Sequence, residues 1–238
     1  VSFAYQDKEV LHDINITLPK NSLTALVGPS GSGKSTVMKL CARFYDPQKG
    51  CIFFNGVPMN EINPESLMSH ISMVFQDVYL FQDTIRNNIR FGKTDATEEE
   101  IIAAAKKACC HDFIMRLPKG YDTLVGEGGC TLSGGEKQRI SIARAMLKDA
   151  QIILLDEATA SLDPENEVEV QKAIDSLIKG RTVIAIAHRL KTIKDADQII
   201  VLDNGRIKEE GTHDELVRNE GLYAHLWNIQ ESISGWKL

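Results

Sequence analysis

Residues 28–36 read GPSGSGKST, and this stretch decides the fold. It fits the pattern G-x-x-x-x-G-K-[ST], in which a glycine-rich backbone cradles phosphates. The apolar run SLTALVG at 22–28 has the length of a buried strand, and STVMKLCARF at 35–44 has helical spacing. A strand, a glycine loop and a helix in this order predict a phosphate-binding loop. The alternative, a glycine-rich turn that binds nothing, leaves the flanking strand and helix unexplained.

Each residue type in this loop has properties that favour binding of a phosphate anion or of its metal ion. Gly28, Gly31 and Gly33 let the backbone turn tightly and approach a phosphate with no Cβ in the way. The amides at the start of the helix, together with the helix dipole, form an anion site. Lys34 can reach the β- and γ-phosphates, and the Ser35 hydroxyl can ligate Mg²⁺. The residues predicted to bind nucleotide here are Gly28, Pro29, Ser30, Gly31, Ser32, Gly33, Lys34, Ser35 and Thr36.

A pair of carboxylates follows a second apolar strand, in IILLDEATASLD at 152–163. Asp156 ends this strand, which is where open α/β sheets bind ligands. Its carboxylate suits a hold on the water molecules of Mg²⁺. Glu157 follows at once and is placed to orient and polarise an attacking water. The alternative is a solvated Asp-Glu pair that only caps the strand.

A second glycine-rich stretch, LSGGEKQR at 132–139, opens an amphipathic run. Ser133 and Glu136 have the spacing of a capping box, so Ser133 is predicted to begin a helix. The amides of Gly134 and Gly135 would then be bare at the positive end of that helix. The stretch predicts a second anion site, with a merely well-capped helix as the alternative.

The rest of the pattern alternates strands and helices, which favours a mainly parallel sheet. Strands are expected at 70–75, at 182–187 and within 198–211. Asn55-Gly56 and Asn204-Gly205 are predicted hairpin turns. Two further capping boxes are predicted, one at Thr97 and Glu100 and one at Thr212 and Glu215.

Composition narrows the class of protein. With 238 residues, the chain fits one large α/β domain or one domain with a small inserted subdomain. Its net charge of −6 lacks the basic footprint of a nucleic-acid binder. The longest apolar runs have strand length, well short of the roughly 18–20 residues that span a bilayer. Five cysteines without zinc spacing read as reduced thiols of a cytosolic protein. Because the chain starts at Val1 inside a strand pattern, we expect it to be a piece of a longer protein.

Taken together, GPSGSGKST, LSGGE and IILLDEATASLD resemble the nucleotide-binding domain of ABC transporters, over essentially the whole chain. The resemblance implies an α/β fold: a P-loop NTPase (RecA-like) core at 1–82 and 151–238 with an antiparallel β layer, and an inserted α-helical subdomain at 83–150. It implies ATP and Mg²⁺ as cofactors, and two such domains packed head to tail around two ATP molecules. Residues 133–136 of one domain would then contact the γ-phosphate held by the other, which explains the two anion sites.

The resemblance also implies roles for single residues. Tyr5 would stack on adenine, Gln76 would touch Mg²⁺ and the attacking water, and His188 would contact the γ-phosphate. An ordinary strand tyrosine and a structural histidine are the alternatives for Tyr5 and His188. The implied catalytic residues are Glu157, His188, Gln76 and Lys34, and the implied metal-binding residues are Ser35, Gln76 and Asp156. The ASLD segment at 160–163 would lie along the seam of the dimer.

Two segments, 76–89 and 123–136, resemble the exporter type. In the second, Glu127 is retained while Gly128 stands where arginine is usual in the contact with the membrane domain. We therefore expect the ATP-hydrolysing motor domain of an exporter-type transporter, on the cytoplasmic face of a cell membrane. Its partners would be a second such domain, identical or different, and a membrane domain fused N-terminally. The alternatives are a soluble ABC-type ATPase, a siderophore importer of the same architecture, and an assembly module that binds ATP but barely turns it over.

Overall fold

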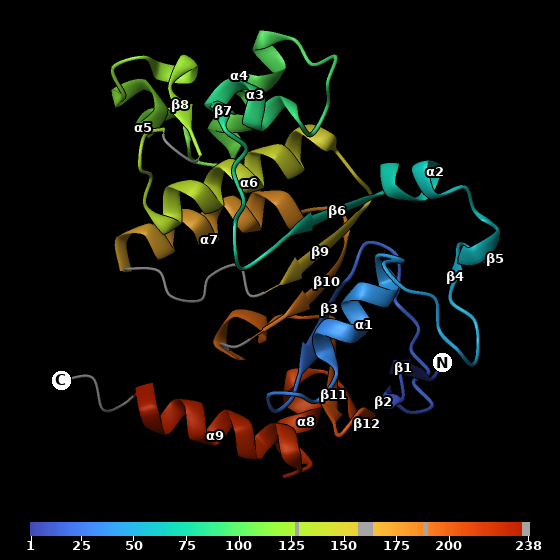
Figure 1. Cartoon of the computed structure of the whole chain (residues 1–238). Coiled ribbons are helices and arrows are strands. Elements are labelled where there is room, and N and C mark those ends of the chain that lie inside the picture. The colour runs from blue at the N-terminus through green and yellow to red at the C-terminus, as the bar shows by residue number, and fades with distance from the viewer. Residues whose placement is uncertain (127–128, 157–163, 188–189, 235–238) are drawn as a thin grey trace. The chain divides into compact units, whose positions relative to one another are not determined.

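The computed structural model describes residues 1–126, 129–156, 164–187 and 190–234, which form two compact units (Figure 1). The first unit comprises Val1–Ile71, Leu154–Asp156 and Gly180–Leu238, and the second comprises Ser72–Ile153 and Glu157–Lys179. The chain changes unit along two strands, β6 (Ile71–Val74) and β9 (Ile152–Asp156). The boundaries expected from the sequence, at 82/83 and 150/151, remain predictions.

The first unit holds most of the strands. Its N-terminal elements are β1 (Phe3–Tyr5), β2 (Lys8–Leu11), β3 (Leu23–Val27), α1 (Lys34–Cys41), β4 (Phe53–Phe54), β5 (Val57–Pro58), the 3₁₀ turn η1 (Met59–Glu61) and α2 (Pro64–Ser69). Its C-terminal elements are β10 (Thr182–Ile186), the 3₁₀ turn η3 (Leu190–Ile193), β11 (Gln198–Asp203), β12 (Arg206–Gly211), α8 (His213–Arg218) and α9 (Leu222–Ser234).

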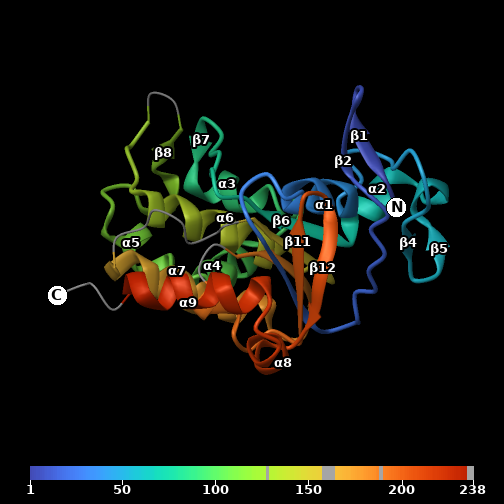
Figure 2. The same cartoon turned by 90° about the horizontal axis from the view of Figure 1, so that it is seen from below.

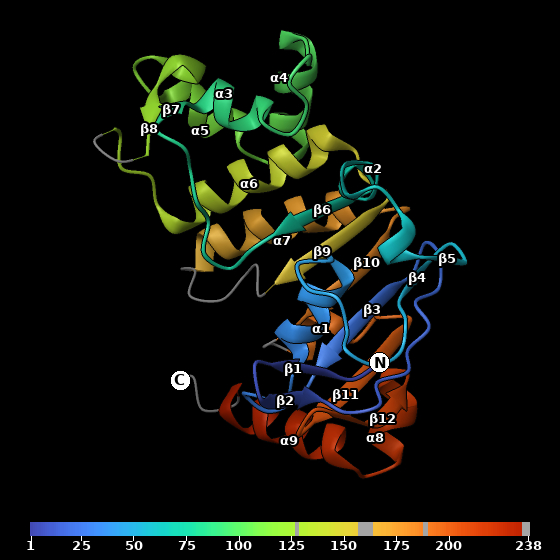
Figure 3. The ribbon, with the colours of Figure 1, turned by 45° about the vertical axis from the view of Figure 1, so that its right-hand side comes forward.

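The main sheet of this unit has the strand order β12-β11-β3-β10-β9. As the alternating pattern predicts, β3 is parallel to both β10 and β11, while β12 runs antiparallel to β11. Because successive side chains of a strand point to opposite faces, β3 contributes side chains to the packing on both faces of the sheet. Ala25 and Val27 are buried with Leu216 and Tyr223 of the C-terminal helices. Figure 3 shows α1 beside β3.

Both predicted Asn-Gly turns are confirmed. Asn204 and Gly205 have φ of 46° and 71°, and they join β11 to β12, which lie side by side in Figure 2. Asn55 and Gly56, with φ of 49° and 81°, join β4 to β5. These left-handed dihedrals are those of a type I′ hairpin turn, which matches the twist of the flanking strands. The antiparallel pairs β1–β2 and β4–β5 represent the antiparallel part predicted beside the parallel sheet.

The second unit is mainly helical. Its elements are β7 (Asp83–Thr84), α3 (Ile85–Arg90), α4 (Glu98–Lys107), α5 (His111–Arg116), the 3₁₀ turn η2 (Gly120–Asp122), β8 (Leu124–Val125), α6 (Gly134–Lys148) and α7 (Pro164–Ile178). Its core includes isoleucines from α3, α4, α5 and α6. The fully buried members are Ile85, Ile89, Ile101, Ile114, Ile140 and Ile142.

The helix predicted at 35–44 ends earlier than its spacing indicates. α1 stops at Cys41, and Arg43 has a φ of 54°. A left-handed residue cannot continue a right-handed helix. The Arg43 guanidinium instead donates to the carbonyls of Asn60 and Ile62, at 3.1 and 2.6 Å, so the turn is held from outside the helix.

Candidate functional site

The phosphate loop, residues 28–36, joins the end of β3 to α1. Gly28 has a φ of 148°, and a Cβ built on it would lie 2.0 Å from the carbonyl oxygen of Leu202 on β11. Gly33 caps α1 with a φ of 106°, and its Cβ would lie 2.6 Å from Leu11 Cδ2. Gly28 therefore requires glycine for both dihedral angle and space, and Gly33 requires it for its dihedral angle.

The side chain of Lys34 folds back over this loop. Its Nζ donates to the carbonyls of Gly28 and Pro29, at 2.8 and 2.9 Å, and to Ser32 Oγ at 3.4 Å. The residue is 7 % exposed. An ammonium held at the mouth of a glycine loop, beside a helix N-terminus that has no side-chain cap, is an arrangement that attracts phosphate.

Two oxygen-bearing side chains stand near the ends of parallel strands in this unit. Ser35 is exposed in the first turn of α1, and Asp156 is half-buried at the last position of β9. Figure 3 shows the arrowheads of β3 and β9 pointing toward the same edge of the sheet. A hydroxyl and a carboxylate are hard oxygen donors of the kind that Mg²⁺ takes. The chemistry of the pair therefore fits the predicted metal.

Tyr5 lies at the end of β1 in a cluster of aromatic rings. Its ring meets Phe3 at 4.8 Å and Tyr45 at 5.3 Å between centroids, both edge to face. Lys39 Nζ lies 5.8 Å from the centroid of the same ring. Such edge-to-face contacts hold a ring firmly. The half-buried ring is thus a fixed aromatic platform in the unit that carries the phosphate loop.

Several predicted site residues lie outside the described part of the chain. They are Glu157, the ASLD segment at 160–163 and His188, together with Glu127 and Gly128 of the exporter-like segment. Their roles remain predictions.

The LSGGE segment forms the helix start that its spacing predicts. Ser133 is the N-cap of α6, and its Oγ accepts from the Glu136 amide at 3.2 Å. The Glu136 carboxylate accepts in turn from the Ser133 amide at 2.8 Å. Ser133 and Gly134 are exposed, while Gly135 is buried. The capping box is confirmed, and it leaves the amides of the two glycines at the positive end of a fifteen-residue helix.

Gln76 belongs to the same unit as this helix start. It is exposed and follows β6 by two residues. The carbonyl of the preceding residue, Phe75, accepts a hydrogen bond of 3.3 Å from Gln138 Nε2 of α6. The backbone that carries Gln76 is therefore tied to the helix that carries Ser133. Of the predicted residues, 28–36, Tyr5 and Asp156 share the first unit, and Gln76 and 133–136 share the second.

Comparison with known proteins decides the family. A family model described as ABC transporter matches residues 11–160, which include the phosphate loop, the LSGGE segment and β9. The chain belongs to the ABC transporter family. The described residues of this ABC domain include no helix long and apolar enough to cross a membrane.

Curated relatives of this ABC domain are longer proteins. It is 52 % identical over 226 residues to the "ATP-dependent lipid A-core flippase" of Legionella pneumophila (strain Paris), covering 95 % of the chain and 38 % of that protein. It is 52 % identical over 231 residues to "ABC transporter aclQ" of Aspergillus oryzae, covering 97 % of the chain and 29 % of that protein. The chain thus spans well under half of each of these two relatives.

A solved structure agrees in fold and sequence. The structure of a bacterial Atm1-family ABC exporter with ATP bound matches with a TM-score of 0.90 and 48 % identity, over 97 % of the chain and 40 % of the exporter. These matches identify an exporter-type nucleotide-binding domain with a P-loop NTPase fold, the class of ATP-hydrolysing domain that the sequence predicts.

The ABC domain also carries an aromatic groove that the motifs do not predict. It measures about 320 Å³ and lies in the second unit. The aromatic groove is lined by Phe75, Asp77, Tyr79, Phe81, Phe91, Arg144 and Lys148, among others. Tyr79 and Phe91 are 72 % and 62 % exposed. Exposed aromatic side chains gathered in one groove mark an interaction surface.

Arg144 organises this groove from α6. Its guanidinium lies 5.4 Å from the Phe81 ring and 5.6 Å from the Phe91 ring. Nε donates to the carbonyl of Asn88 at 2.8 Å, and Nη2 donates to Asn88 Oδ1 at 3.1 Å. Burial lowers the pKa of Arg144. A single cation thus fixes two aromatic rings of the groove by stacking and fixes α3 by hydrogen bonds.

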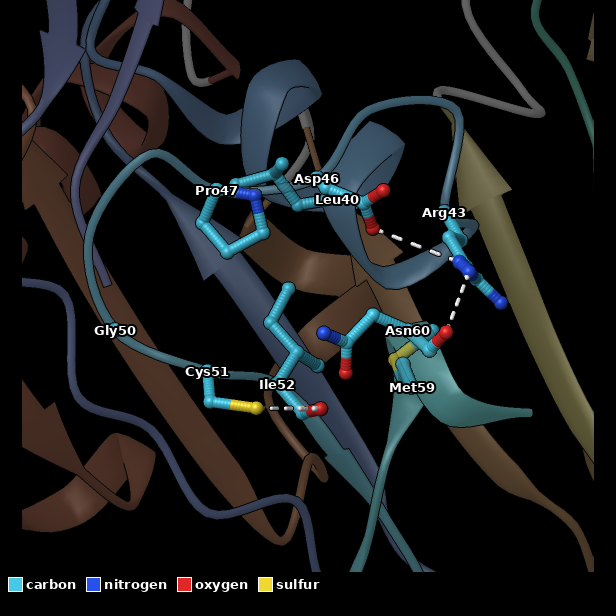
Figure 4. A pocket seen from close by; sticks show the side chains of 9 residues that line it. All are labelled: Leu40, Arg43, Asp46, Pro47, Gly50, Cys51, Ile52, Met59 and Asn60. Carbon is cyan, nitrogen blue, oxygen red and sulfur yellow. Dashed lines mark hydrogen bonds and ion pairs between the residues drawn. The ribbon is translucent and has the colours of Figure 1, made fainter.

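A smaller cavity of about 60 Å³ lies beyond the end of α1 (Figure 4). Figure 4 shows the Arg43 side chain reaching toward both Asp46 and Asn60 at its rim. The Arg43–Asp46 ion pair measures 3.5 Å. The cavity holds a few water molecules at most, so it is too small for a nucleotide. The Arg43 contacts at its rim support the end of α1.

Proposed function

We propose that the chain is the Mg²⁺-dependent ATPase motor domain of an exporter-type transporter. The single observation that carries the proposal is the pair of anion-binding helix starts in two units of one chain. The phosphate loop with Lys34 begins α1, and the bare amides after Ser133 begin α6. Two anion sites in one chain are explained if each one contributes to a nucleotide site shared with a second copy or a related domain.

In this mechanism, ATP binds with its β- and γ-phosphates against the loop amides and Lys34, and with its adenine on Tyr5. The oxygens of Ser35, Asp156 and Gln76 would hold Mg²⁺, which when bound neutralises charge on the β- and γ-phosphates. Binding would replace the contacts of the Lys34 ammonium with neutral carbonyls by contacts with an anionic phosphate, in which both partners are charged.

The second domain closes on this site from the opposite side. Its helix start at Ser133, with the following two glycine amides, reaches the γ-phosphate. Glu157 polarises the attacking water, while Lys34 and His188 stabilise the charge that develops in the transition state. Hydrolysis removes the anion that joined the two domains, and they separate.

The aromatic groove supports a membrane domain as the second partner. Gln76 and the groove lie in one unit, and both are tied to α6, through Gln138 and through Arg144. Motion of α6 toward a nucleotide would therefore move the groove. The names of the relatives, a flippase and an exporter among them, favour transport out of the cell or across its membrane over a soluble ATPase.

Steady-state phosphate release tests the enzymatic part of the proposal. The chain should hydrolyse ATP with Mg²⁺ present and stop when EDTA removes it. Glu157→Gln should lower the rate at least about a hundredfold, since general-base catalysis contributes that much. A Glu157→Gln variant that hydrolyses ATP as fast as the parent chain would remove Glu157 from the mechanism.

A further inference from the structure

Arg139 is a buried cation in the second turn of α6. It is 8 % exposed, and its guanidinium lies 5.1 Å from the Phe113 ring. Nη2 donates to Asn166 Oδ1 at 3.1 Å, and Nη1 donates to the Cys109 carbonyl at 3.3 Å. Nε is buried without a hydrogen-bond partner in the described part of the chain. Both hydrogen-bond acceptors are neutral groups, and the Glu169 carboxylate on α7 interacts with Arg139 through its charge.

Asn166, on α7, makes a second contact with α6, in the first turn of that helix. A Cβ built on Gly135 would lie 2.5 Å from Asn166 Cβ and 2.8 Å from Asn166 Oδ1. Gly135 and Arg139 are four residues apart and therefore lie on one face of α6. One side chain in the first turn of α7 therefore fixes the first two turns of α6, by close packing at Gly135 and by a hydrogen bond at Arg139.

We propose that Asn166 is a positioning residue that holds the anion-binding start of α6 in place through Gly135 and Arg139. The inference rests on the proposed function of residues 133–135. Charge-assisted hydrogen bonds weaken steeply when donors shift, so a loosened first turn binds the partner's γ-phosphate less well. α7 also begins directly after residues 157–163. In the sequence, Asn166 lies three residues after this segment, which contains Glu157.

The first measurement is hydrogen exchange on the chain without nucleotide. The amides of Glu136 and Lys137 donate to Ser133 Oγ and to the Ser133 carbonyl, at 3.2 and 3.0 Å, and they report on the first turn. Asn166→Ala should speed their exchange about tenfold, the factor expected when a hydrogen bond to a charged group is lost. Asn166→Asp, which keeps the shape and the acceptor oxygen, should restore protection. Unchanged exchange in Asn166→Ala would overturn the proposal.

The second measurement is light scattering in a Glu157→Gln background. Adding Asn166→Ala should weaken ATP-dependent dimerisation about tenfold, while the affinity of the monomer for a fluorescent ATP analogue stays within twofold. The matched control is Gln171→Ala on the same helix, which removes only a hydrogen bond of 2.8 Å to Asp175. Equal losses in both variants, or an equal loss of nucleotide affinity, would overturn the positioning role. If the Glu157→Gln parent does not dimerise with ATP, the shared site between two copies of this chain is wrong, and the exchange measurement still decides the role of Asn166.

Discussion

Ser133 and Glu136 satisfy each other's backbone amides at the start of α6, with hydrogen bonds of 3.2 and 2.8 Å. This reciprocal capping fixes the first turn and uses neither amide of the two intervening glycines. The same arrangement occurs at Thr97 and Glu100, at the start of α4. The two helix starts differ in the two residues after the cap, which are glycines after Ser133 and glutamates after Thr97.

This pair of caps separates a structural role from a functional one. Ser133→Ala and Thr97→Ala should each lower the free energy of unfolding by about 1 kcal/mol, because each removes one N-cap hydrogen bond. Only Ser133→Ala should lower ATP turnover, since only that helix start faces a phosphate in the proposed dimer. Urea unfolding and phosphate release on both variants check the prediction. Equal turnover in the two variants would reduce the LSGGE segment to a well-capped helix.

Lys34→Ala should weaken ATP binding. The ammonium contributes the one side-chain charge that the described phosphate loop, residues 28–36, holds at its mouth. Losing a charge-assisted contact to phosphate costs at least about tenfold in affinity. A titration with a fluorescent ATP analogue measures it, and Lys106→Ala, an exposed lysine on α4, serves as the control. Unchanged affinity in Lys34→Ala would reject the loop as the nucleotide site.

Gly28 and Gly31 form a matched pair for stability. Both have positive φ, but a Cβ on Gly31 meets no atom within 4 Å, whereas a Cβ on Gly28 meets the Leu202 carbonyl. Gly31→Ala should cost about 1–2 kcal/mol of unfolding free energy from the dihedral alone. Gly28→Ala should cost more than about 3 kcal/mol, because two strands must also move apart. Equal midpoints of urea unfolding would contradict this account of the loop.

Burial separates the reactivities of the cysteines. Burial raises the pKa of Cys110 to about 12, whereas Cys51 and Cys130 are exposed. At pH 8, a thiol of that pKa is only about one part in ten thousand thiolate, and the thiolate is the reactive form. Iodoacetamide at pH 8, followed by peptide mapping, should modify Cys51 and Cys130 and spare Cys110 until denaturant is added. Reaction of Cys110 at the rate of Cys51 in the native chain would contradict its burial.

Local signals predict most of the framework. Apolar runs mark β3 and β9, Asn-Gly pairs mark the turns before β5 and β12, and Ser/Thr-x-x-Glu spacings mark the starts of α4, α6 and α8. Each of these signals acts within a few residues, so the sequence displays it directly.

Contacts between residues that are distant in the sequence leave no such local signal and could not be predicted. The Arg139–Asn166 bond joins residues 27 apart, and the Arg144–Asn88 bonds join residues 56 apart. Neither pair forms a motif, because their proximity comes from helix packing. The strands β7 and β8, two residues each, are too short to show a period. The aromatic groove could not be predicted either, because packing brings Phe91 and Arg144 to Phe75, Tyr79 and Phe81. Only the last three are closely spaced in the sequence.

The measurement that tests the central claim most directly is light scattering on Glu157→Gln, first with ATP and Mg²⁺ and then with ADP and Mg²⁺. Blocking hydrolysis should trap the closed state, in which each γ-phosphate joins the phosphate loop of one chain to the LSGGE segment of the other. The account predicts a dimer with ATP and a monomer with ADP. A monomer in both, with ATP binding confirmed by fluorescence, would contradict the shared site between two copies of this chain.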